Sequence, residues 1–423
     1  MADKKYRAVR GTTDILPAEQ PYWRYVEKVI NDITRLYGYQ RIDTPIFEDT
    51  SLFQRSTGEY TDIVQKEMYT FDDRGGNSLT LKPEGTPSVC RAYIQHGMSS
   101  LPQPVKLYYI TPIFRYDRPQ AGRYRQHYQF GYEAIGDADP ALDAEVIDMA
   151  WQLYRSLGMT GITLQINSIG CKKCRPGYLN ALKEYYKGYA GQLCNDCKTR
   201  LEKNPLRLLD CKQASCQKIA DNAPRNADHL CQECREHFSN TQKYLGLLNI
   251  PFSLNHRLVR GLDYYTRTVF EIQPEDEEGG QSTIGGGGRF DYLIEELGGK
   301  PTPAIGFATG IERIIINFKK QGTPVPATPA LQALIIYIGD KPREEAIKLA
   351  CRLRQAGISA VTAAGGKSLK AQLRHANALG VSYTVIIGED ELKAGAATLR
   401  EMANARQETI PLANLAERLK SSG

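Results

Sequence analysis

The chain has 423 residues, of which 41% are hydrophobic and 24% charged, and its net charge is +6. This length exceeds what one core holds, so we expect two or three domains, and the composition is ordinary for a soluble globular protein. The densest apolar run, residues 331–338, is too short for a bilayer, and no apolar stretch follows the first residues, so we expect a cytoplasmic protein with neither membrane span nor secretory signal.

Helix and strand patterns alternate over roughly the first 160 residues. Apolar residues at helical spacing predict a helix over residues 19–37, which Gly38 ends. Residues 41–48 predict a short strand, and Pro45 makes it an edge or interface strand. The other elements expected here are strands at 79–81 and 162–166 and helices at 88–96 and 139–158.

An arginine-rich hairpin is the most informative feature. Strand patterns at 105–110 and 128–133 flank a turn for which Pro119 and Gly122 supply the chemistry. Arginines on a rigid hairpin can grip a phosphate through two hydrogen bonds and can meet a polyanion at the loop tip. The alternative is a basic hairpin that only faces water. The arginines concerned are Arg115, Arg118, Arg123 and Arg125.

Residues 171–250 differ in kind, because they hold eight of the ten cysteines, many basic residues and helical patterns without a clear strand. We interpret them as an insertion. In a cytoplasmic protein these cysteines are not expected to form disulfides, and no thioredoxin-like strand precedes them. Two CxxC pairs separated by nineteen residues fit a four-cysteine zinc site, and two tandem sites or one interleaved site can be built from the whole set; reduced thiols are the alternative. The candidate zinc ligands are Cys171, Cys174, Cys194, Cys197, Cys211, Cys216, Cys231 and Cys234.

Strand patterns return after the insertion. Residues 258–272 and 282–293 predict a hairpin around an acidic turn, and 302–319 predicts a strand leading into a helix. The Pro- and Gly-containing stretch 321–329 predicts a linker. Beyond it, we expect a small α/β domain with parallel strands, made of strands at 333–338, 360–363 and 383–387 and helices at 343–356, 369–379 and 413–419.

These motifs together resemble those of histidyl-tRNA synthetases. The arginine hairpin and residues 304–313 resemble motifs 2 and 3 of class II aminoacyl-tRNA synthetases, and Pro45 stands where that class has its motif 1 proline. Residues 258–265 and 285–291 resemble two signatures peculiar to the histidyl enzymes, as does 10–17. The resemblance covers nearly the whole chain.

The resemblance implies an α+β class II synthetase core, an antiparallel sheet flanked by helices, with a Cys-rich insertion and a C-terminal α/β anticodon-binding domain. The implied boundaries are 1–170 and 251–320 for the two parts of the core, 171–250 for the insertion, 321–329 for the linker and 330–423 for the anticodon-binding domain.

Amino acid activation builds negative charge on phosphate oxygens, so it needs fixed cations rather than a covalent nucleophile. The resemblance implies that Arg115 and Arg260 are catalytic and hold the α-phosphate, and that Arg313 holds the terminal phosphate. It also places Arg123 at ATP, and Arg123 with Gln120 at the acceptor end of tRNA. The alternative for Arg260 is a buried ion pair with a partner such as Asp263.

Histidine recognition requires groups for both imidazole nitrogens and for the α-amino group. The resemblance assigns the imidazole to Glu133 and Tyr265, and the amino and carboxylate groups to Gln129 and Glu84; the alternative for Glu84 is an acid favoured at a helix N-terminus. The full implied histidine-binding set is Glu84, Gly85, Thr86, Arg115, Gln129, Glu133, Arg260, Tyr264 and Tyr265. One departure from the family pattern is Phe290 in place of a tyrosine and Tyr292 in place of a glycine, for which we expect a repacked pocket wall.

The implied reaction joins L-histidine to its tRNA in two steps, through histidyl-adenylate formed from ATP with Mg²⁺. The implied partners are histidine tRNA, L-histidine, ATP and a second copy of the chain, with no membrane, and a structural Zn²⁺ is a further candidate. A regulatory paralogue of ATP phosphoribosyltransferase is the alternative, but it usually lacks the C-terminal domain and erodes the Arg260 loop. A generic basic RNA-binding module explains the charge but not the combination of Glu133, Tyr265 and Arg260.

Overall fold

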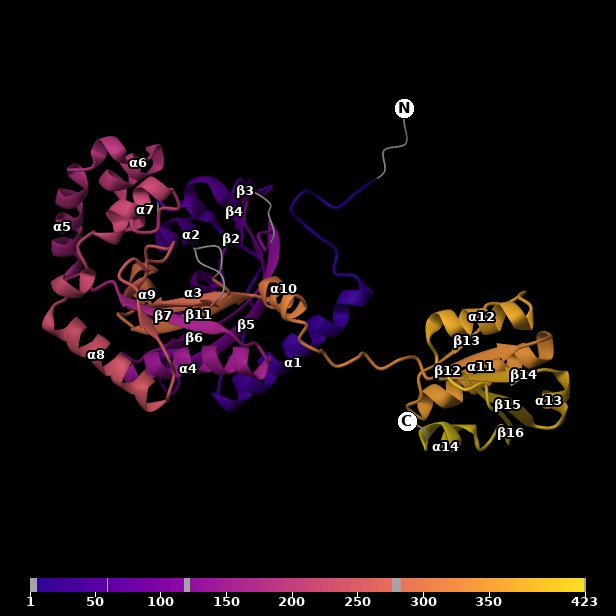
Figure 1. Ribbon diagram of the computed structural model, residues 1–423. Helices are drawn as coiled ribbons and strands as arrows, with labels where there is room; N and C mark the ends of the chain where they lie inside the picture. The colour runs from indigo at the N-terminus through magenta and orange to yellow at the C-terminus, as the bar shows by residue number, and fades with distance from the viewer. Residues whose placement is uncertain (1–5, 59, 118–121, 276–282, 422–423) are drawn as a thin grey trace, which may run out of the picture. The chain divides into compact units, whose positions relative to one another are not determined.

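The computed structural model describes residues 6–58, 60–117, 122–275 and 283–421. The chain forms two compact units, Met1–Pro326 and Ala327–Gly423, which Figure 1 shows with the labels used below. Among the described residues, the helices are all too short or too polar to cross a membrane.

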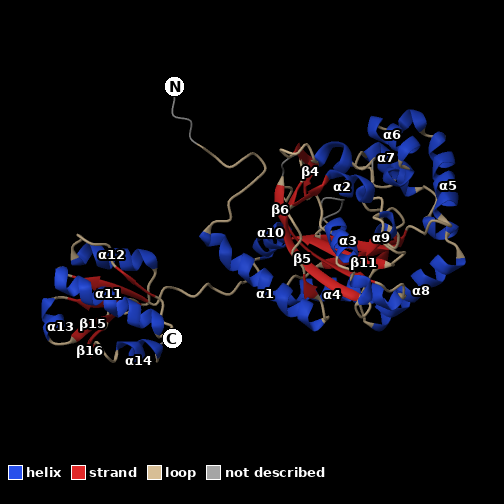
Figure 2. Cartoon of the chain, turned by 180° about the vertical axis from the view of Figure 1, so that it is seen from behind, coloured by secondary structure: helices blue, strands red, loops and turns tan. Residues whose placement is uncertain are grey.

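The first unit is built on an eight-stranded sheet, seen in red among blue helices in Figure 2. Its central strands are antiparallel, and only the edge pairs β1–β5 and β7–β8 are parallel. The expected antiparallel sheet flanked by helices is therefore confirmed, with a sheet that is mixed at its edges. In spatial order the strands are β1 (Gln40–Arg41), β5 (Val105–Phe114), β6 (Gln126–Ile135), β11 (Ala304–Gly310), β10 (Gly285–Arg289), β9 (Thr266–Pro274), β7 (Ile162–Ser168) and β8 (Ser253–Leu254).

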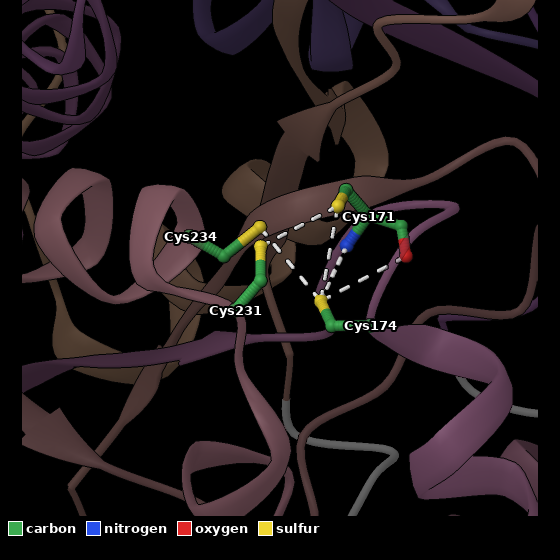
Figure 3. A group of neighbouring side chains, drawn as sticks. All are labelled: Cys171, Cys174, Cys231 and Cys234. Carbon is green, nitrogen blue, oxygen red and sulfur yellow. Dashed lines mark hydrogen bonds between the residues drawn. The ribbon is translucent and has the colours of Figure 1, made fainter.

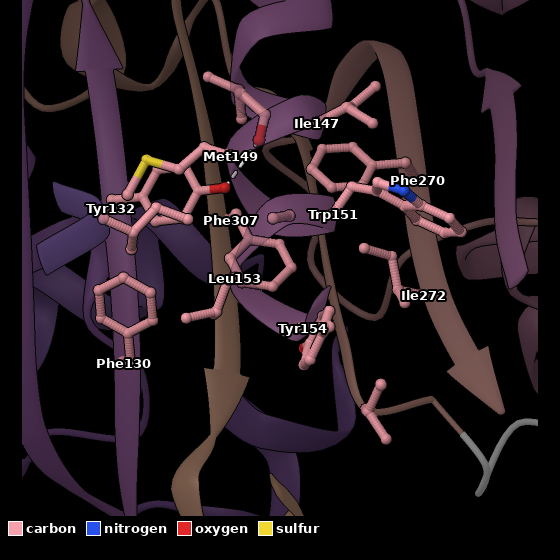
Figure 4. Close-up of a cluster of buried hydrophobic side chains, with 14 of the residues drawn as sticks. Phe130, Tyr132, Ile147, Met149, Trp151, Leu153, Tyr154, Phe270, Ile272 and Phe307 are labelled. Atoms are coloured by element: carbon pink, nitrogen blue, oxygen red, sulfur yellow. Dashed lines mark hydrogen bonds between the residues drawn. The ribbon is translucent and has the colours of Figure 1, made fainter. Parts of the chain in front are cut away.

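One face of this sheet carries the main apolar core. Alternate side chains of the strands point into it, among them Phe130 and Tyr132 of β6 and Phe270 of β9, which Figure 4 shows packed against Phe307 of β11. The rings of Phe270 and Phe307 are stacked with their centroids 6.0 Å apart. The helices that cover this face are α1 (Gln20–Leu36), α4 (Pro140–Ser156), α8 (Gln232–Leu247) and α10 (Ile311–Gln321).

Shorter elements lie over the opposite face. The stretch 41–48, predicted as one strand, instead supplies strands to two different sheets, because Pro45 cannot donate a ladder hydrogen bond and interrupts it. The second sheet is small, with the order β2–β4–β3. The elements here are β2 (Phe47–Asp49), α2 (Thr50–Thr57), β3 (Tyr69–Asp72), β4 (Ser78–Leu81), α3 (Thr86–Gln95) and α9 (Leu293–Glu296).

In the insertion, helices are the only regular secondary structure within the described residues 171–250, as the sequence predicts. Both figures show α5, α6 and α7 gathered beyond one end of the sheet, whereas α8 returns along the core helix α4. Its helices are α5 (Arg175–Lys187), α6 (Asn195–Lys203), α7 (Ala214–Asp221) and α8. Short turns of 3-10 or π helix complete the first unit at Pro17–Glu19, Ile63–Glu67, Met98–Ser100, Ala190–Gln192, Pro205–Leu208 and Asn226–His229.

The second unit has a five-stranded sheet in the order β13–β12–β14–β15–β16. The first three strands are parallel, as expected, but β15 and β16 form an antiparallel hairpin that the prediction of parallel strands omitted. Charged residues such as Arg400 and Glu408 interrupt the apolar pattern of this edge hairpin. The elements are β12 (Ala333–Tyr337), α11 (Asp340–Gln355), β13 (Ala360–Thr362), α12 (Leu369–Leu379), β14 (Tyr383–Ile387), α13 (Glu389–Lys393), β15 (Ala396–Glu401), β16 (Gln407–Pro411) and α14 (Leu415–Lys420).

Candidate active site

The register of β6 and β11 places Glu133 on the sheet face opposite the main apolar core, in a group of buried side chains (Glu84, Glu133, Tyr264 and Tyr265) that we call the carboxylate pocket. Because side chains alternate along a strand, Gln129 and Glu133 of β6 point away from the apolar core that holds Phe130 and Tyr132. Gly306 of β11 lies opposite Glu133, and a Cβ atom placed on it would be 1.6 Å from a carboxylate oxygen of Glu133. Glycine at this position therefore makes the room that the Glu133 carboxyl group occupies.

Two buried carboxyl groups face this pocket. Thr86 donates a hydrogen bond of 2.7 Å to one oxygen of Glu133, whose other oxygen, Oε2, has no hydrogen-bond partner among the described residues. Tyr264 donates a hydrogen bond of 2.7 Å to Glu84, and Thr57 donates one of 3.3 Å. Glu84 precedes α3 by two residues, but its hydrogen bonds come from these hydroxyl groups, so the helix N-terminus is not its main partner.

Both carboxyl groups are protonated more readily than usual. Burial raises the pKa of Glu84 to about 7, although Tyr264 and Arg115 act in the opposite direction. Burial also raises the pKa of Glu133 well above its ordinary range, and the neighbouring Glu84 raises it further. Two buried acids side by side cost free energy when both are ionised, and a cationic ligand between them removes that cost.

A cavity of about 380 Å³ lies beside this pocket. Arg115 donates a hydrogen bond of 2.7 Å to the carbonyl oxygen of Pro83, which holds its guanidinium at the base of the hairpin. Arg313 donates to the carbonyl oxygens of Gly122 and Thr283, and Arg123 pairs with Asp117 at 3.2 Å. The arginines that line the cavity are Arg115, Arg123, Arg207, Arg260 and Arg313.

Arg260 lies in a loop that precedes β9. The predicted strand over residues 258–272 is therefore shorter than expected, since β9 begins only at Thr266. The Arg260 guanidinium forms a short ion pair with Glu271 of β9, and Thr283 donates a second hydrogen bond of 2.7 Å to that carboxylate. The expected alternative partner, Asp263, instead accepts a hydrogen bond from Asn204. Gly286 lies opposite Glu271 in β10, and a Cβ atom there would be 2.7 Å from Arg260, so this glycine makes room for the guanidinium.

The cavity and the carboxylate pocket are in contact. Gln129 lines the cavity, and Tyr109 donates long hydrogen bonds of 3.5 Å to Gln129 and 3.4 Å to Glu133. On the other side, Arg260 lies 5.8 Å from the ring centroid of Tyr265, which packs against Tyr264 at 4.7 Å. The fold thus brings an arginine-lined cavity close to a pair of buried carboxyl groups.

The candidate zinc ligands form two nested groups. Cys171 and Cys174 meet Cys231 and Cys234, with all four sulfur atoms pointing toward one another in Figure 3. The inner group consists of Cys194, Cys197, Cys211 and Cys216. Joining the first two CxxC pairs in one site is therefore wrong, and so are the tandem and interleaved arrangements. Within each group the four sulfur atoms lie within 4.8 Å of one another.

Two known families match the chain. The family described as Histidyl-tRNA synthetase matches residues 11–174 and 187–314. The chain belongs to the histidyl-tRNA synthetase family. A second description, Anticodon binding domain, matches residues 332–422, which lie in the second unit.

Individual members of the histidyl-tRNA synthetase family are similar over nearly their whole length. A histidine–tRNA ligase of Dehalococcoides mccartyi is 60% identical over 410 residues, which are 97% of this chain and 98% of the relative. One of Desulforamulus reducens is 50% identical over 96% of this chain and 97% of the relative. The crystal structure of apo S. aureus histidyl-tRNA synthetase, at 38% identity, matches with a TM-score of 0.83 and covers 98% of this chain and 100% of that one. The predicted family and enzyme class are confirmed.

The residues that the family resemblance implies for the site fall into two neighbouring groups, apart from Gln120. The cavity is lined by Arg115, Arg123, Gln129, Arg260 and Arg313. Gly85 lies between Glu84 and Thr86, where a Cβ atom would be 2.3 Å from the ring of Tyr109. The buried group beside the cavity comprises Glu84, Gly85, Thr86, Glu133, Tyr264 and Tyr265. Gln120 lies outside the described residues.

Sequence reasoning missed Glu271, the partner of Arg260, and several residues that line the cavity. Glu271 could have been noticed as a lone carboxylate between Phe270 and Ile272 in an apolar strand. Glu312 accepts hydrogen bonds of 2.9 and 3.0 Å from the backbone N–H of Tyr128, and burial raises its pKa to about 7. The pattern gave no signal for Glu67, His127 or Arg207, which also line the cavity. Burial, with help from Arg115 and Arg313, lowers the pKa of His127 to about 3, so this ring is neutral.

The two departures from the family pattern occupy different places. Phe290 is buried with its ring edge-on to Tyr264 at 5.8 Å, so an apolar contact stands where a hydroxyl group is missing. Tyr292 points toward the insertion, where the ammonium group of Lys172 lies 4.1 Å from its ring centroid. Lys172 is within the CxxC pair of the outer cysteine group, so the second departure lies at the contact between core and insertion.

Proposed function

We propose that this chain attaches L-histidine to histidine tRNA in two steps, first forming histidyl-adenylate from histidine and MgATP with release of pyrophosphate, then transferring histidine to the tRNA 3′ end. The observation that carries this proposal is the contact between a pocket of two buried carboxyl groups and a cavity lined by arginines. The pocket suits a small cation with several donors, and the cavity suits a polyphosphate.

Histidine binds in the pocket of Glu84 and Glu133. Its positive amino group neutralises the paired acids, and the free oxygen of Glu133 accepts a hydrogen bond from the imidazole together with the hydroxyl group of Tyr265. Gln129, at the boundary with the cavity, orients the amino and carboxylate groups. A pocket of this kind rejects amino acids that leave its buried polar groups without partners.

The arginines act on charge that develops during activation. Arg115 and Arg260 hold the α-phosphate while the histidine carboxylate attacks it, and Arg313 holds the terminal phosphates as pyrophosphate leaves. Mg²⁺ enters with ATP and supplies further neutralisation of the phosphate oxygens. Because Arg115 and Arg313 are already fixed by backbone carbonyl groups, little reorganisation is required at the moment of reaction.

The two ends of the tRNA meet different units. The acceptor end contacts the hairpin loop through Arg123 and Gln120, where phosphate contacts and proximity supply most of the effect. The second unit binds the anticodon. Transfer then requires only that the terminal ribose reach the adenylate held between Arg115 and Arg260.

We also propose a cytoplasmic homodimer. Phe47 and Phe71 of the small sheet are 50% and 44% exposed, and their rings lie 6.4 Å apart. Ile46, which directly precedes β2, is 46% exposed. Together they adjoin Pro45, the motif 1 position, and such an exposed apolar cluster is characteristic of a surface that a partner covers. Structural Zn²⁺ at the cysteines is the remaining cofactor proposed.

The test is histidine-dependent ATP–pyrophosphate exchange, followed by charging of histidine tRNA. The wild-type protein should catalyse both, and Arg260→Ala should reduce exchange about 100-fold or more. Histidine binding without any exchange in the wild-type protein would favour the regulatory paralogue. That alternative is less supported, because the Arg260 loop and the second unit are both present.

A further inference from the structure

We propose that the insertion binds two zinc ions, one in each nested cysteine group, and that the outer ion positions the histidine pocket through Arg175 and Tyr265. This inference deepens the proposed function and rests on it for the identity of the pocket. The outer site comprises Cys171, Cys174, Cys231 and Cys234, and the inner site Cys194, Cys197, Cys211 and Cys216.

The sulfur separations match tetrahedral zinc. Four thiolates at about 2.3 Å from one Zn²⁺ lie about 3.8 Å from one another. In the outer site, Cys171 is 3.8 Å from both Cys174 and Cys231, and Cys174 is 3.9 Å from Cys234. In the inner site, Cys194 and Cys211 are 3.8 Å apart. A disulfide requires about 2.05 Å, and every cysteine of the chain is free.

Backbone N–H groups also point at the sulfur atoms, as they do around metal-bound thiolates. The N–H of Cys171 lies 3.3 Å from the sulfur of Cys174, and the N–H of Cys194 lies 3.4 Å from the sulfur of Cys216. Gly170 has a φ of +69°, and a Cβ atom on it would be 2.8 Å from the sulfur of Cys174. This turn therefore needs glycine in order to bring the first CxxC pair to the second.

The outer site is connected directly to the pocket wall. Arg175, the residue after Cys174, donates a hydrogen bond of 2.6 Å to the carbonyl oxygen of Tyr265. Just before the site, Ile169 and Gly170 exchange backbone hydrogen bonds of 2.8 and 2.9 Å with Arg267. The segment that carries Tyr265 is thus held on both sides by residues whose positions the outer cysteines set.

The inner site supports a different contact. From the segment between its second and third cysteines, Arg207 pairs with Asp62 at 3.2 Å, and Asn204 donates a hydrogen bond of 2.7 Å to Asp263. Arg207 and Asp62 both line the arginine cavity. Loss of the inner ion should therefore disturb the cavity, whereas loss of the outer ion should disturb the histidine pocket.

The experiment measures zinc in the full-length protein by elemental analysis and then the Michaelis constants in pyrophosphate exchange. The wild-type protein should hold two zinc ions per chain, and Cys234→Ser and Cys216→Ser should each hold one. Cys351→Ser, which changes an exposed cysteine outside both groups, should still hold two. In Cys234→Ser the KM for histidine should rise roughly tenfold with little change in the KM for ATP.

Arg175→Lys tests the link between the outer site and the histidine pocket without changing a cysteine. It can be used even if Cys234→Ser does not fold. It should keep both zinc ions and still raise the KM for histidine. Fewer than two zinc ions per chain in protein purified without chelators would overturn the inference, even if exchange is normal. An unchanged KM for histidine in zinc-replete Arg175→Lys would overturn the positioning role. Two zinc ions without any exchange would leave the metal sites standing and reject the proposed function instead.

Discussion

Arg260, which lines the arginine-rich cavity, forms an ion pair with Glu271 of β9. Burial alone would lower the pKa of Arg260, but Glu271 and Tyr265 reverse this and raise it, so the guanidinium keeps its charge. Removal of one partner from such a pair leaves an uncompensated charge. We therefore expect Glu271 to fix the orientation of the Arg260 guanidinium.

Glu271→Gln should lower the rate constant of histidine-dependent exchange about tenfold, because Arg260 loses its fixed direction but not its charge. Arg260→Ala should lower it more. If Glu271 acts only through Arg260, the double variant should be no slower than Arg260→Ala alone. Additive losses in this double-mutant cycle, measured by pyrophosphate exchange, would show that Glu271 has a separate role.

Glu84→Gln should stabilise the empty protein at high pH only. The pKa of Glu84 is raised from 4.5 to about 7 in the folded protein, so the associated stability is present below about pH 4.5 and is lost as the pH rises through about 7. The variant should therefore gain up to about 3 kcal/mol in the free energy of unfolding at pH 8 and little near pH 4.5. Denaturant titrations at both pH values measure this, and an equal gain at both would contradict the assignment.

Gly306→Ala should weaken histidine binding at least about tenfold and lower the melting temperature, because the new methyl group overlaps the Glu133 carboxyl group. Gly246→Ala is the matched control. It lies in α8 with nothing within 4 Å of the added atom, so it should be neutral or slightly stabilising. Calorimetric titration with histidine gives both affinities, and equal affinities would show that the pocket is not built around Gly306.

Phe47→Asp should shift the protein from dimer to monomer, because a charge in the centre of the exposed cluster opposes its burial. The matched control is Leu254→Asp, which changes an equally prominent apolar side chain at 62% exposure on another edge of the unit. Light scattering coupled to size-exclusion chromatography measures the mass. A dimer that persists in Phe47→Asp would place the interface elsewhere.

Local patterns predicted most elements well because each depends on a few neighbouring residues. Helix 369–379 and strand 383–387 have the predicted limits. The cysteine arrangement was wrong for the opposite reason, since spacing along the chain cannot show that Cys171 and Cys231 are brought together where the insertion leaves and rejoins the core. The partner of Arg260 was missed similarly, because Glu271 is adjacent only after the loop folds back over β9.

Function was predictable where the chemistry uses consecutive residues. The turn from Glu84 to Thr86 and the pair Tyr264 and Tyr265 could be read together, and the structure places them in one buried group. Residues from the insertion, such as Arg207, gave no signal because their part in the cavity depends on how two distant segments dock. Such contacts depend on tertiary packing, which the helical or strand periodicity of the sequence does not reveal.

The nesting of the two cysteine groups means that the chain enters and leaves the insertion at one place. The segment that enters the insertion, at Cys171, lies next to the segment that leaves it, at Cys231. Helix α8 then continues along α4 as part of the core. Because the two ends of the insertion are already close together, the conformational entropy lost in closing this loop does not depend on the spacing of the strands in the sheet. A change in length within the stretch between Cys174 and Cys231 that spares Asn204 and Arg207 should therefore leave the register of the sheet unchanged.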